Sequence, residues 1–585
     1  MTRLGLQLAG LMCGLLCTLV AEAEERTVVD VNKVGAVADD GKDDTAAVQA
    51  AIDAFAGKDG ARLVFGKGRY DFFAGRNPRS KHAAMLFRKC KNLTIEGKET
   101  TLLFHGLTAA MQFAQCDRVT VRNLTIDWER PPFSVGTVAA ARGRSFDVKV
   151  FKEYPVKGGE PVQAFMEYDP KTRLPRRRGL DVYHQVKSTE LIGPQELRLK
   201  LTRSVAVRPG MLLVLRHQVY RYNALSFREC SDVKVENVTV YTTPGMAVTG
   251  HRSKDFLLKN VQVRIRPGTN RLMSSTADAT HFNSCSGEIR IRDCLFEGMG
   301  DDAVNVHGMW HTVKAVVGKH TVVTNCRNGW LIPPEPGDKM EFTDPKTILP
   351  YAEGRVKSVA LDRKSKVHRI EFADALPGRL KKGDVLGNVS WAPKLHISGC
   401  TVRANRARGF LVQTRHAVIE KNVFEHVTGA GIHVTTDVGH WQESIGTRDV
   451  VIQGNTFEEC NYGPAMAQAP INVFAHLPGW KDVPNPGVHR NLVIEGNTIR
   501  GTDNAAIFVS ATDGVAIRNN VIENCSRDRI RTSGKSAIYL MNTRHATVTG
   551  NRLAEKRRGK DLREPLGIGP GCDKKTITVR DNVGF

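Results

Sequence analysis

The chain has 585 residues, a formal net charge of +23 and 41% hydrophobic residues. This length allows a large core or several domains, and no apolar run beyond the N-terminal one is long enough to cross a bilayer as a helix. The positive charge suits anionic glycans or a membrane surface, but no nucleic-acid-binding motif accompanies it, so no nucleic-acid partner is expected.

The first residues have the pattern of a secretory signal. MTRLGLQLAGLMCGLLCTLVAEAEE combines one early Arg, an apolar run and a small-residue ending, which predicts cleavage after Ala23. Residues 1–23 are therefore expected to be a signal peptide, and the mature protein to be periplasmic, on the cell surface or secreted. The basic runs at 173–179 and 555–560 are expected to be solvated loops.

The cysteines follow a repeated phrase. Cys90, Cys116, Cys230 and Cys285 each open a similar strand, in CKNLTI, CDRVTV, CSDVKV and CSGEIRI. Equivalent positions in stacked repeats predict a ladder of small buried side chains, which we favour over a disulfide framework even though export permits disulfides. No CxxC pair suggests a metal, and no cofactor is expected.

An internal repeat sets the architecture. Alternating strands on either side of an Asn, or of a substitute for it, recur as in VKVENVTV and VVIQGNTF. The marker positions are Asn123, Asn237, Asn260, Cys294, Cys400, Asn422, Asn455, Asn497, Asn520, Asn551 and Asn582. Many are 22 or 23 residues apart and others 31 to 34. Strand-and-turn repeats of this period predict a parallel β-helix, with Asn at corners where it tolerates left-handed backbone and stacks its amides.

The N-terminal segment fits the start of such a solenoid. Residues 30–55 predict a short strand, an acidic turn and an amphipathic helix that Asp44 or Thr45 would cap. The apolar face of this helix would contain Val48, Ala51, Ile52 and Phe55. This opening resembles that of pectin-lyase-fold proteins, so the expected class is an all-β, right-handed parallel β-helix with its open end covered.

Two stretches interrupt the repeat and divide the chain. Residues 131–220 and 312–392 lack the marker and contain many short strands, which predicts two inserted small β-barrel domains closed by strands at 208–216 and 381–389. The remaining segments are predicted to be the N-terminal cap with the first coils (24–130), coils with acidic residues (221–311) and C-terminal coils (393–585).

Three aspartates fall one repeat length apart. Asp278 lies in STADATHFNSC, and Asp301 and Asp302 follow 23 and 24 residues later in EGMGDDAVNVHG. Coils stack about 4.8 Å apart, so the three carboxylates should line one cleft. Inverting glycosidases need roughly 6.5–9.5 Å between acid and base and retaining ones roughly 5 Å, and the spacing allows either. A plain turn is the alternative, which the nearby His281 and Asn305 make less attractive.

The site resembles two glycosidase families. It is similar to the three-aspartate site of polygalacturonases, but ADATHFN replaces the NTD phrase and the GHG and RIK phrases are missing. The whole chain resembles glycoside hydrolase family 110 more closely. The shared features are the signal, the β-helix, two β-barrel insertions and the motifs DATHFNSCSG and GMGDDAVNVHG.

That resemblance implies an exo-acting, inverting α-1,3-galactosidase acting on blood group B structures, with linear α-1,3-galactosides accepted by some members. The catalytic residues would be Asp278, Asp301 and Asp302. We predict Asp278 as the acid, with the pair orienting water, although repulsion within the pair leaves the reverse assignment open.

The expected substrate is an oligosaccharide or a glycoprotein glycan, and a homo-oligomer is left open. Candidate substrate contacts are His281, Asn305, His307, Arg408, Gln413, Trp441 and Glu443. A Trp ring suits the apolar face of galactose, whereas Glu, Asn and Arg suit its hydroxyls. For each of these residues taken singly, a purely structural role is an equally good alternative. His433 is expected to be a packed or surface histidine.

Three other functions remain open at this point. A polygalacturonase-like hydrolase would suit the positive charge, and a polysaccharide lyase would want a calcium site or a basic Lys or Arg. A non-catalytic glycan-binding β-helix would bind without cleavage. The acceptor sugar, the need for a fucose branch and the disulfide pairing are not fixed by the sequence.

Overall fold

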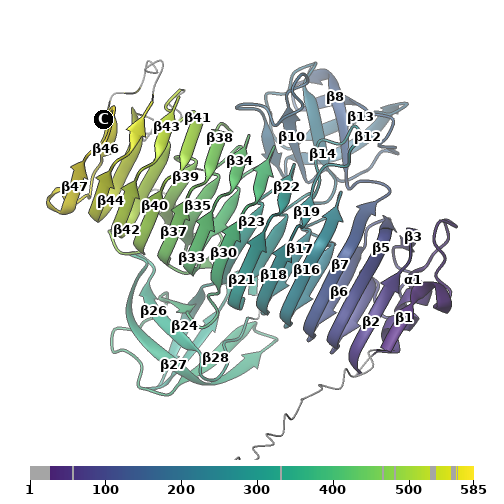
Figure 1. The fold of residues 1–585 in the computed structure, drawn as a ribbon, viewed down its shortest axis with the longest axis horizontal. Helices are drawn as coiled ribbons and strands as arrows, with labels where there is room; N and C mark the ends of the chain where they lie inside the picture. Colours follow the sequence, from purple (N-terminus) through teal and green to yellow (C-terminus); the bar gives the residue numbers. More distant parts are fainter. Residues whose placement is uncertain are drawn as a thin grey trace, which may run out of the picture.

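The computed structural model describes residues 27–55, 58–329, 332–463, 467–479, 482–527, 535–554, 562 and 564–585. The predicted signal peptide and the basic run at 555–560 lie outside these ranges. Figure 1 shows one long solenoid of stacked strands, with a small β-module on each side of it in this view. No helix within the described ranges is long and apolar enough to span a membrane.

The solenoid has three faces, each a stack of parallel strands from successive coils. The first consists of β4 (Ala83–Arg88), β6 (Ala109–Ala114), β15 (Leu225–Arg228), β17 (Val248–His251), β20 (Thr280–Asn283), β23 (Val304–Met309), β32 (Phe410–Val412), β35 (Ile432–Asp437), β39 (Ile471–His476) and β46 (Glu564–Ile568). The second consists of β1 (Thr27–Asp30), β2 (Asp59–Phe65), β18 (Lys254–Lys259), β21 (Ser286–Arg292), β30 (Lys394–Ser398), β33 (Arg415–Glu420), β37 (Arg448–Gln453), β40 (His489–Glu495) and β47 (Ile577–Arg580).

The third face completes each coil before the chain returns to the first. It consists of β3 (Gly68–Phe73), β19 (Gln262–Val263), β22 (Leu295–Glu297), β31 (Thr401–Arg403), β34 (Val423–Glu425), β38 (Thr456–Cys460), β41 (Thr498–Thr502), β43 (Val521–Glu523) and β45 (Arg552–Leu553). Long strands that bend between faces are β5 (Lys91–His105), β7 (Asp117–Trp128), β16 (Ser231–Val240), β42 (Ile507–Arg518) and β44 (Ser536–Thr549). The predicted parallel β-helix is confirmed.

A column of asparagines joins the C-terminal coils. Its members are Asn422, Asn455, Asn497, Asn520, Asn551 and Asn582. At each step the backbone N–H and the side-chain Nδ2 of one Asn donate to the Oδ1 of the next, at 2.9 to 3.0 Å. The predicted stacking of amides along the axis is therefore confirmed, and it satisfies polar groups that burial would otherwise leave without partners.

The backbone conformation at the asparagine marker differs between the two halves of the solenoid. Asn123, Asn237 and Asn260 have φ of 58°, 53° and 50°, the left-handed conformation that was predicted. In the C-terminal column the prediction is wrong, because the residue before the Asn takes positive φ instead, as Lys421 (54°) and Gly454 (61°) do. The turn is thus made one residue earlier, which frees the Asn side chain to point inward.

The interior of the solenoid is apolar and stacked like on like. Phe87, Phe113, Phe227, Phe256 and Phe282 form one aromatic column, with ring centroids 4.6, 4.6, 5.9 and 5.0 Å apart. Phe87, Phe113, Phe227 and Phe282 hold one register position in successive coils, and Phe256 of β18 fills the space beside Gly250, which holds that position in β17. Aromatic pairs at these distances add stabilisation beyond the area that they bury.

A second column confirms the predicted ladder of small side chains. Cys90, Cys116, Cys230 and Cys285 are buried and free of disulfides. Ser253 occupies the equivalent position between the last two, where its hydroxyl accepts a hydrogen bond from the Cys230 backbone N–H at 2.9 Å. The column therefore depends on small size and burial rather than on cross-links.

The helix α1 (Thr45–Asp53) covers the N-terminal end of the solenoid (Figure 1). It buries Val48, Ala51 and Ile52, and Phe55 just beyond it is buried too. Asp44 stands at its N-cap position, but its side chain does not cap the helix. Its two carboxylate oxygens instead accept hydrogen bonds from the backbone N–H groups of Val37 (2.9 Å) and Asp71 (3.0 Å), which ties the helix to the first coils.

The first inserted module is an antiparallel sheet of seven strands. These are β8 (Phe133–Arg142), β9 (Ser145–Val150), β10 (Ala164–Tyr168), β11 (Asp181–Tyr183), β12 (Val186–Gly193), β13 (Glu196–Leu201) and β14 (Leu212–Arg216). The edge strands β11 and β12 are not paired with each other within the described residues, so this module is a sheet rather than the closed barrel that was predicted. β14, predicted to close a barrel, lies inside the sheet between β10 and β8.

The second inserted module is a closed barrel. Its strands are β24 (His311–Val317), β25 (Thr321–Asn325), β26 (Lys339–Asp344), β27 (Leu349–Asp362), β28 (Val367–Phe372) and β29 (Val385–Asn388). β29 closes it by pairing with both β24 and β26. β24 begins two residues after β23 ends, so the barrel is joined directly to a strand of the first face.

We expect Asn497→Ala to lower the free energy of unfolding by roughly 2–4 kcal/mol, because it leaves the buried backbone N–H of Asn455 without an acceptor and removes the side-chain hydrogen bonds to Asn455 and Asn520. Asn237→Gly is the matched control, since it removes an exposed amide of the other column and keeps the positive φ. Thermal melts followed by circular dichroism measure both. Equal melting temperatures for Asn497→Ala and the unchanged protein would contradict the role given to the column.

Candidate active site

Coil stacking brings the three aspartates together. Asp278 lies just before β20, and Asp301 and Asp302 lie just before β23, while Thr280 and Val304 of these strands pair in register. Each aspartate contributes one carboxylate oxygen to a group in which all the oxygens lie within 4.8 Å of one another. The three residues are at least nine-tenths buried, so their mutual repulsion is little screened by water.

Asp301 is held in its ionised form. Its Oδ2 accepts a hydrogen bond from the Tyr220 hydroxyl at 2.7 Å, and its Oδ1 pairs with Arg406 Nη1 at 2.7 Å. Burial alone would raise the pKa of this carboxyl, but Arg406, Arg408 and the Tyr220 hydroxyl outweigh it and place the pKa below its usual range. Asp301 is therefore the carboxylate of the group at neutral pH.

Asp302 accepts two hydrogen bonds from one arginine. The Arg408 backbone N–H donates to Oδ1 at 3.1 Å and its Nη2 donates to Oδ2 at 2.8 Å. Burial raises the pKa of Asp302 well above its usual value, Arg408 opposes the shift, and the charges of Asp301 and Asp278 add to it. Both carboxyl oxygens of Asp302 nevertheless accept a hydrogen bond from Arg408.

Asp278 lies at the end of a chain of hydrogen bonds whose direction can be worked out. His307 Nδ1 lies 2.8 Å from the Gly308 carbonyl, which can only accept, so Nδ1 carries the hydrogen. The pKa values of His307 and His281 are lowered, mainly by burial, so both rings are neutral. His307 Nε2 is then an acceptor for His281 Nε2 at 2.9 Å, and His281 Nδ1 is an acceptor facing Asp278 Oδ2 at 2.7 Å.

The hydrogen of that last contact must come from Asp278. Burial, followed by the charge of Asp301, raises the pKa of Asp278 well above its usual value, in agreement with a protonated carboxyl. Asp278 and Asp302 compete for a proton because each disfavours ionisation of the other. The acceptor nitrogen of His281 favours the proton on Asp278, whereas the donors of Arg408 favour the charged form of Asp302.

Glu443 reaches the site from a later coil. It lies in β36 (Glu443–Ser444), which pairs antiparallel with the end of β23, with Met309 opposite Glu443. Gln413 Nε2 donates to Glu443 Oε2 at 2.5 Å, and His307 Nε2 lies 3.8 Å from Oε1. Burial raises the pKa of Glu443, whereas the Gln413 hydrogen bond and the charge of Arg408 lower it even while both histidines are neutral. These two groups support an ionised Glu443.

A cavity of about 490 Å³ opens over these groups. It is lined by Tyr220, Asn223, Met246, Thr249, Gly250, His251, Asp278, His281, Asn283, Asp301, Asp302, Asn305, His307, Met309, Arg327, Arg408, Trp441 and Glu443. Trp441 is 42% exposed at the cavity, and the Arg327 guanidinium lies 4.5 Å from the centroid of its ring. Of the ten residues predicted from the sequence, nine line the cavity, and Gln413 acts from behind Glu443.

The first module fixes the turns that carry the aspartates. Arg216 is the last residue of β14 and is fully buried. Its Nη1 donates to the carbonyls of Thr276 (3.1 Å) and Gly300 (2.8 Å), which precede the two acidic turns. A Cβ on Gly300 would lie 2.4 Å from the Thr276 carbonyl oxygen, so only glycine fits there.

Sequence reasoning missed the residues that hold Asp301 from outside its own coil. Arg406 stands two positions before the predicted Arg408, in the sequence RARG. Because side chains two positions apart in an extended segment point the same way, this spacing could have indicated Arg406 as well. Asp181 pairs with Arg406 Nε at 3.0 Å, and neither Asp181 nor Tyr220 carried any signal in the sequence. His433 is buried and its pKa lies well below its usual value, so it is packed rather than on the surface.

The three carboxylates also match the donor set of a hard cation, which usually binds through oxygen ligands. In this structure Arg406 and Arg408 supply positive charge to the group, and Tyr220 supplies a further donor. These donors take lone pairs that a bound ion would need. We therefore derive no step through a metal at this position.

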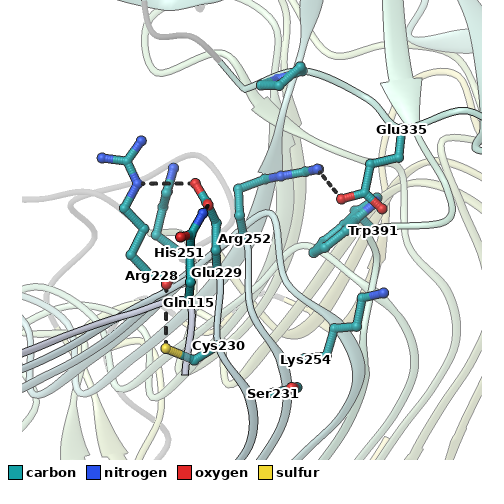
Figure 2. Close-up of a pocket in the computed structure, with 11 residues that line it drawn as sticks. Gln115, Arg228, Glu229, Cys230, Ser231, His251, Arg252, Lys254, Glu335 and Trp391 are labelled. Carbon is teal, nitrogen blue, oxygen red and sulfur yellow. Dashed lines mark hydrogen bonds and ion pairs between the residues drawn. The ribbon is translucent and has the colours of Figure 1, made fainter. Parts of the chain in front are cut away.

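A second hollow of about 570 Å³ adjoins the cavity and shares His251 with it. In Figure 2 the Arg252 side chain extends toward Glu335 and Trp391. The Arg252–Glu335 ion pair measures 2.8 Å, and the guanidinium lies 3.8 Å from the indole ring centroid. Glu229 is likewise paired with a cation. The two carboxyl groups that line this hollow, those of Glu229 and Glu335, are each in an ion pair with an arginine, so the acid–base chemistry is assigned to the first cavity.

The chain is similar in sequence to a repeat family and to several named enzymes. Residues 385–559 match the family described as "Right handed beta helix region". "Alpha-1,3-galactosidase A" of Shewanella woodyi is 27% identical over 556 residues, covering 89% of this chain and 90% of the relative. "Alpha-1,3-galactosidase B" of Bacteroides thetaiotaomicron is 28% identical, covering 94% and 95%. A protein of the same name from Akkermansia muciniphila is 28% identical, covering 91% and 70%.

We expect the thermal stability to fall as the pH is lowered from 6.5 towards 5. Burial lowers the pKa to about 4 at His217, His251, His368, His476 and His489. Because the unfolded value is about 6.5, unfolding takes up protons, so the stability contributed by these neutral rings is complete above pH 6.5 and is lost below it.

Melting temperature against pH measures this dependence. His217→Gln removes one of the titrating rings, so its melting temperature should fall less steeply over the same pH range. A melting temperature that stays constant between pH 6.5 and 5 would contradict the assignment.

Proposed function

We propose that this homologue of the α-1,3-galactosidases is an exo-acting glycoside hydrolase that removes terminal α-1,3-linked galactose with inversion at the anomeric carbon. The observation that carries the proposal is the set of three buried carboxyls in one cavity, where Asp278 faces a nitrogen of the buried His281 and Asp301 faces Arg406 and the Tyr220 hydroxyl. An acid and a carboxylate held together at neutral pH are what glycosidic bond hydrolysis requires.

Asp278 is the proposed general acid. Its carboxyl hydrogen would leave the contact with His281 Nδ1 and pass to the glycosidic oxygen as the bond from that oxygen to the anomeric carbon breaks. His281 and His307 do not touch the reacting atoms in this scheme. They hold the carboxyl in its protonated form by presenting an acceptor nitrogen to Asp278 Oδ2.

The Asp301–Asp302 pair is proposed to hold the attacking water and to take its proton. Each of their four oxygens accepts one hydrogen bond from the protein and keeps a second lone pair that can accept from a water. The choice of water as the nucleophile rests on the resemblance described above. The 4.8 Å limit applies to the nearest oxygens, which lie closer together than the centres of the carboxyl groups. By itself it therefore does not distinguish an inverting from a retaining glycosidase.

The proposed substrate is a terminal galactose on an oligosaccharide or a glycoprotein glycan. A cavity of about 490 Å³ suits a terminal sugar better than the middle of a polymer. Trp441 offers an apolar ring face, and Glu443 offers an ionised acceptor for a hydroxyl. Preference for blood group B structures rests on the resemblance described above, and export rests on the pattern of residues 1–23.

The test follows galactose released from blood group B trisaccharide and from linear Galα1-3Gal by NMR. We expect β-galactose to form first, because water attacks the face opposite to the leaving group. First-formed α-galactose would contradict inversion. Release of galacturonate from polygalacturonic acid, without release of galactose, would favour the polygalacturonase-like function instead.

We expect Asp278→Asn to lower kcat/KM on these glycans about 10²–10⁴-fold, as loss of a general acid does. An aryl α-galactoside with a good leaving group needs little protonation, so Asp278→Asn should regain most of the rate on it, whereas Asp302→Asn should not. Circular dichroism checks that both variants fold. Unchanged hydrolysis of the natural glycans by Asp302→Asn would favour a non-catalytic role for this group.

We expect Tyr220→Phe to move the acidic limb of the pH profile of kcat/KM upward by roughly one unit. The hydroxyl helps to hold the pKa of Asp301 low, and one hydrogen bond to a carboxylate is worth about one unit. Tyr222→Phe, a tyrosine outside the cavity lining, is the control. If the acidic limb does not move in Tyr220→Phe, Asp301 is not one of the groups whose ionisation sets this limb.

A further inference from the structure

Three side chains with metal-binding atoms meet inside the second module, at its junction with the solenoid. His311 begins β24, Cys326 follows β25, and His368 lies in β28. Thr312 pairs with Asn325, so the same ladder sets His311 opposite Cys326, and His368 pairs with Thr324 on the next strand. One ligand atom from each of the three lies within 4.8 Å of the others.

Burial leaves this group with unsatisfied polar atoms. All three residues are at most 2% exposed. Neither ring nitrogen of His368 makes a hydrogen bond of normal geometry, although the Thr324 backbone interacts with the ring. A neutral imidazole always has one N–H and one lone pair, so the fold encloses a donor and an acceptor that it does not otherwise use.

We propose that His311, Cys326 and His368 bind one thiophilic transition-metal ion, zinc or copper(I). Thiolate with two imidazoles is a donor set that both ions favour and that hard cations such as calcium and magnesium do not. This site is separate from the proposed glycosidase chemistry and needs no substrate.

The geometry is close to that of a loaded site. His311 Nδ1 lies 3.7 Å from Cys326 Sγ. Zinc bonds of about 2.3 Å to sulfur and 2.0–2.1 Å to nitrogen place these two atoms about 3.6 Å apart in a tetrahedron. The third ligand atom, from His368, lies within 4.8 Å of the other two. The Thr324 hydroxyl, 3.4 Å from His311 Nδ1, is in place as a fourth neighbour.

Charge also favours an ion with a thiolate. Metal binding deprotonates the thiol, and the thiolate partly or fully balances the charge of the ion in this buried site.

The position of the ion connects it to the cavity. Cys326 packs with Met309, and Met309 lines the cavity at the end of β23. Arg327 follows Cys326 in the chain and stacks on Trp441 at the cavity mouth. A metal at Cys326 would therefore fix the segment that holds the Arg327–Trp441 pair over the substrate.

The experiment uses the whole mature chain. Protein purified without chelators is assayed for metal by mass spectrometry, then stripped with a chelator and titrated with Co²⁺, Zn²⁺ and, under reducing conditions, Cu⁺. We expect one equivalent of zinc or copper per chain, a thiolate-to-cobalt charge-transfer band on adding Co²⁺, and a higher melting temperature in the metal-loaded protein. The mass spectrometry shows whether the bound ion is zinc or copper.

The variants separate a metal site from a merely buried cluster. Cys326→Ser and His368→Leu should each lose the metal and the cobalt band, whereas Cys460→Ser, another buried cysteine in the solenoid, should keep both. If a variant fails to fold, the test uses the unchanged protein instead. In that test, bound zinc should protect Cys326 from an alkylating reagent. The proposal is overturned if the stripped protein gives no thiolate–cobalt band, or if Cys326→Ser binds metal as the unchanged protein does.

Discussion

In-register stacking of parallel strands is the constraint on which the rest of the molecule depends. Hydrogen bonding sets neighbouring coils about 4.8 Å apart, so each side chain lies over its equivalent in the next coil. Where the repeated residue is Asn the amides bond, and where it is Phe the rings stack. Where Asp278 lies beside Asp302 the same geometry is unfavourable, and the protein compensates with Arg408 and a shared proton.

The inserted modules leave that register undisturbed. β16 pairs with β7 across the first insertion, and β30 pairs with β21 across the second, so the solenoid continues as though neither were present. Each module also contributes to the cavity from outside the coils. Arg216 fixes both acidic turns from the first module, and Arg327 reaches the cavity mouth from the second. The coils supply the reacting groups, and the modules supply their support.

This division explains what the sequence could predict. The coil period is local and repeated, so it predicts the fold and places Asp278 one coil from Asp302. The contacts of Tyr220 and Asp181 depend on how a module docks against the solenoid, and no spacing in the sequence records that docking. The group around Cys326 escaped for a related reason, because its ligands come from three strands that the CxxC pattern does not describe.

The hydrogen-bond chain ending at Asp278 also determines what happens after each turnover in the proposed mechanism. Once Asp278 has given up its proton, a carboxylate faces the lone pair of His281 Nδ1 at 2.7 Å, and two acceptors repel. A proton entering His281 relieves that repulsion, since the imidazole can then donate to Asp278. Glu443, 3.8 Å from His307 Nε2, helps the paired rings to hold that proton for a short time. Because burial disfavours a charged His281, the proton then passes to Asp278 and the acid is restored.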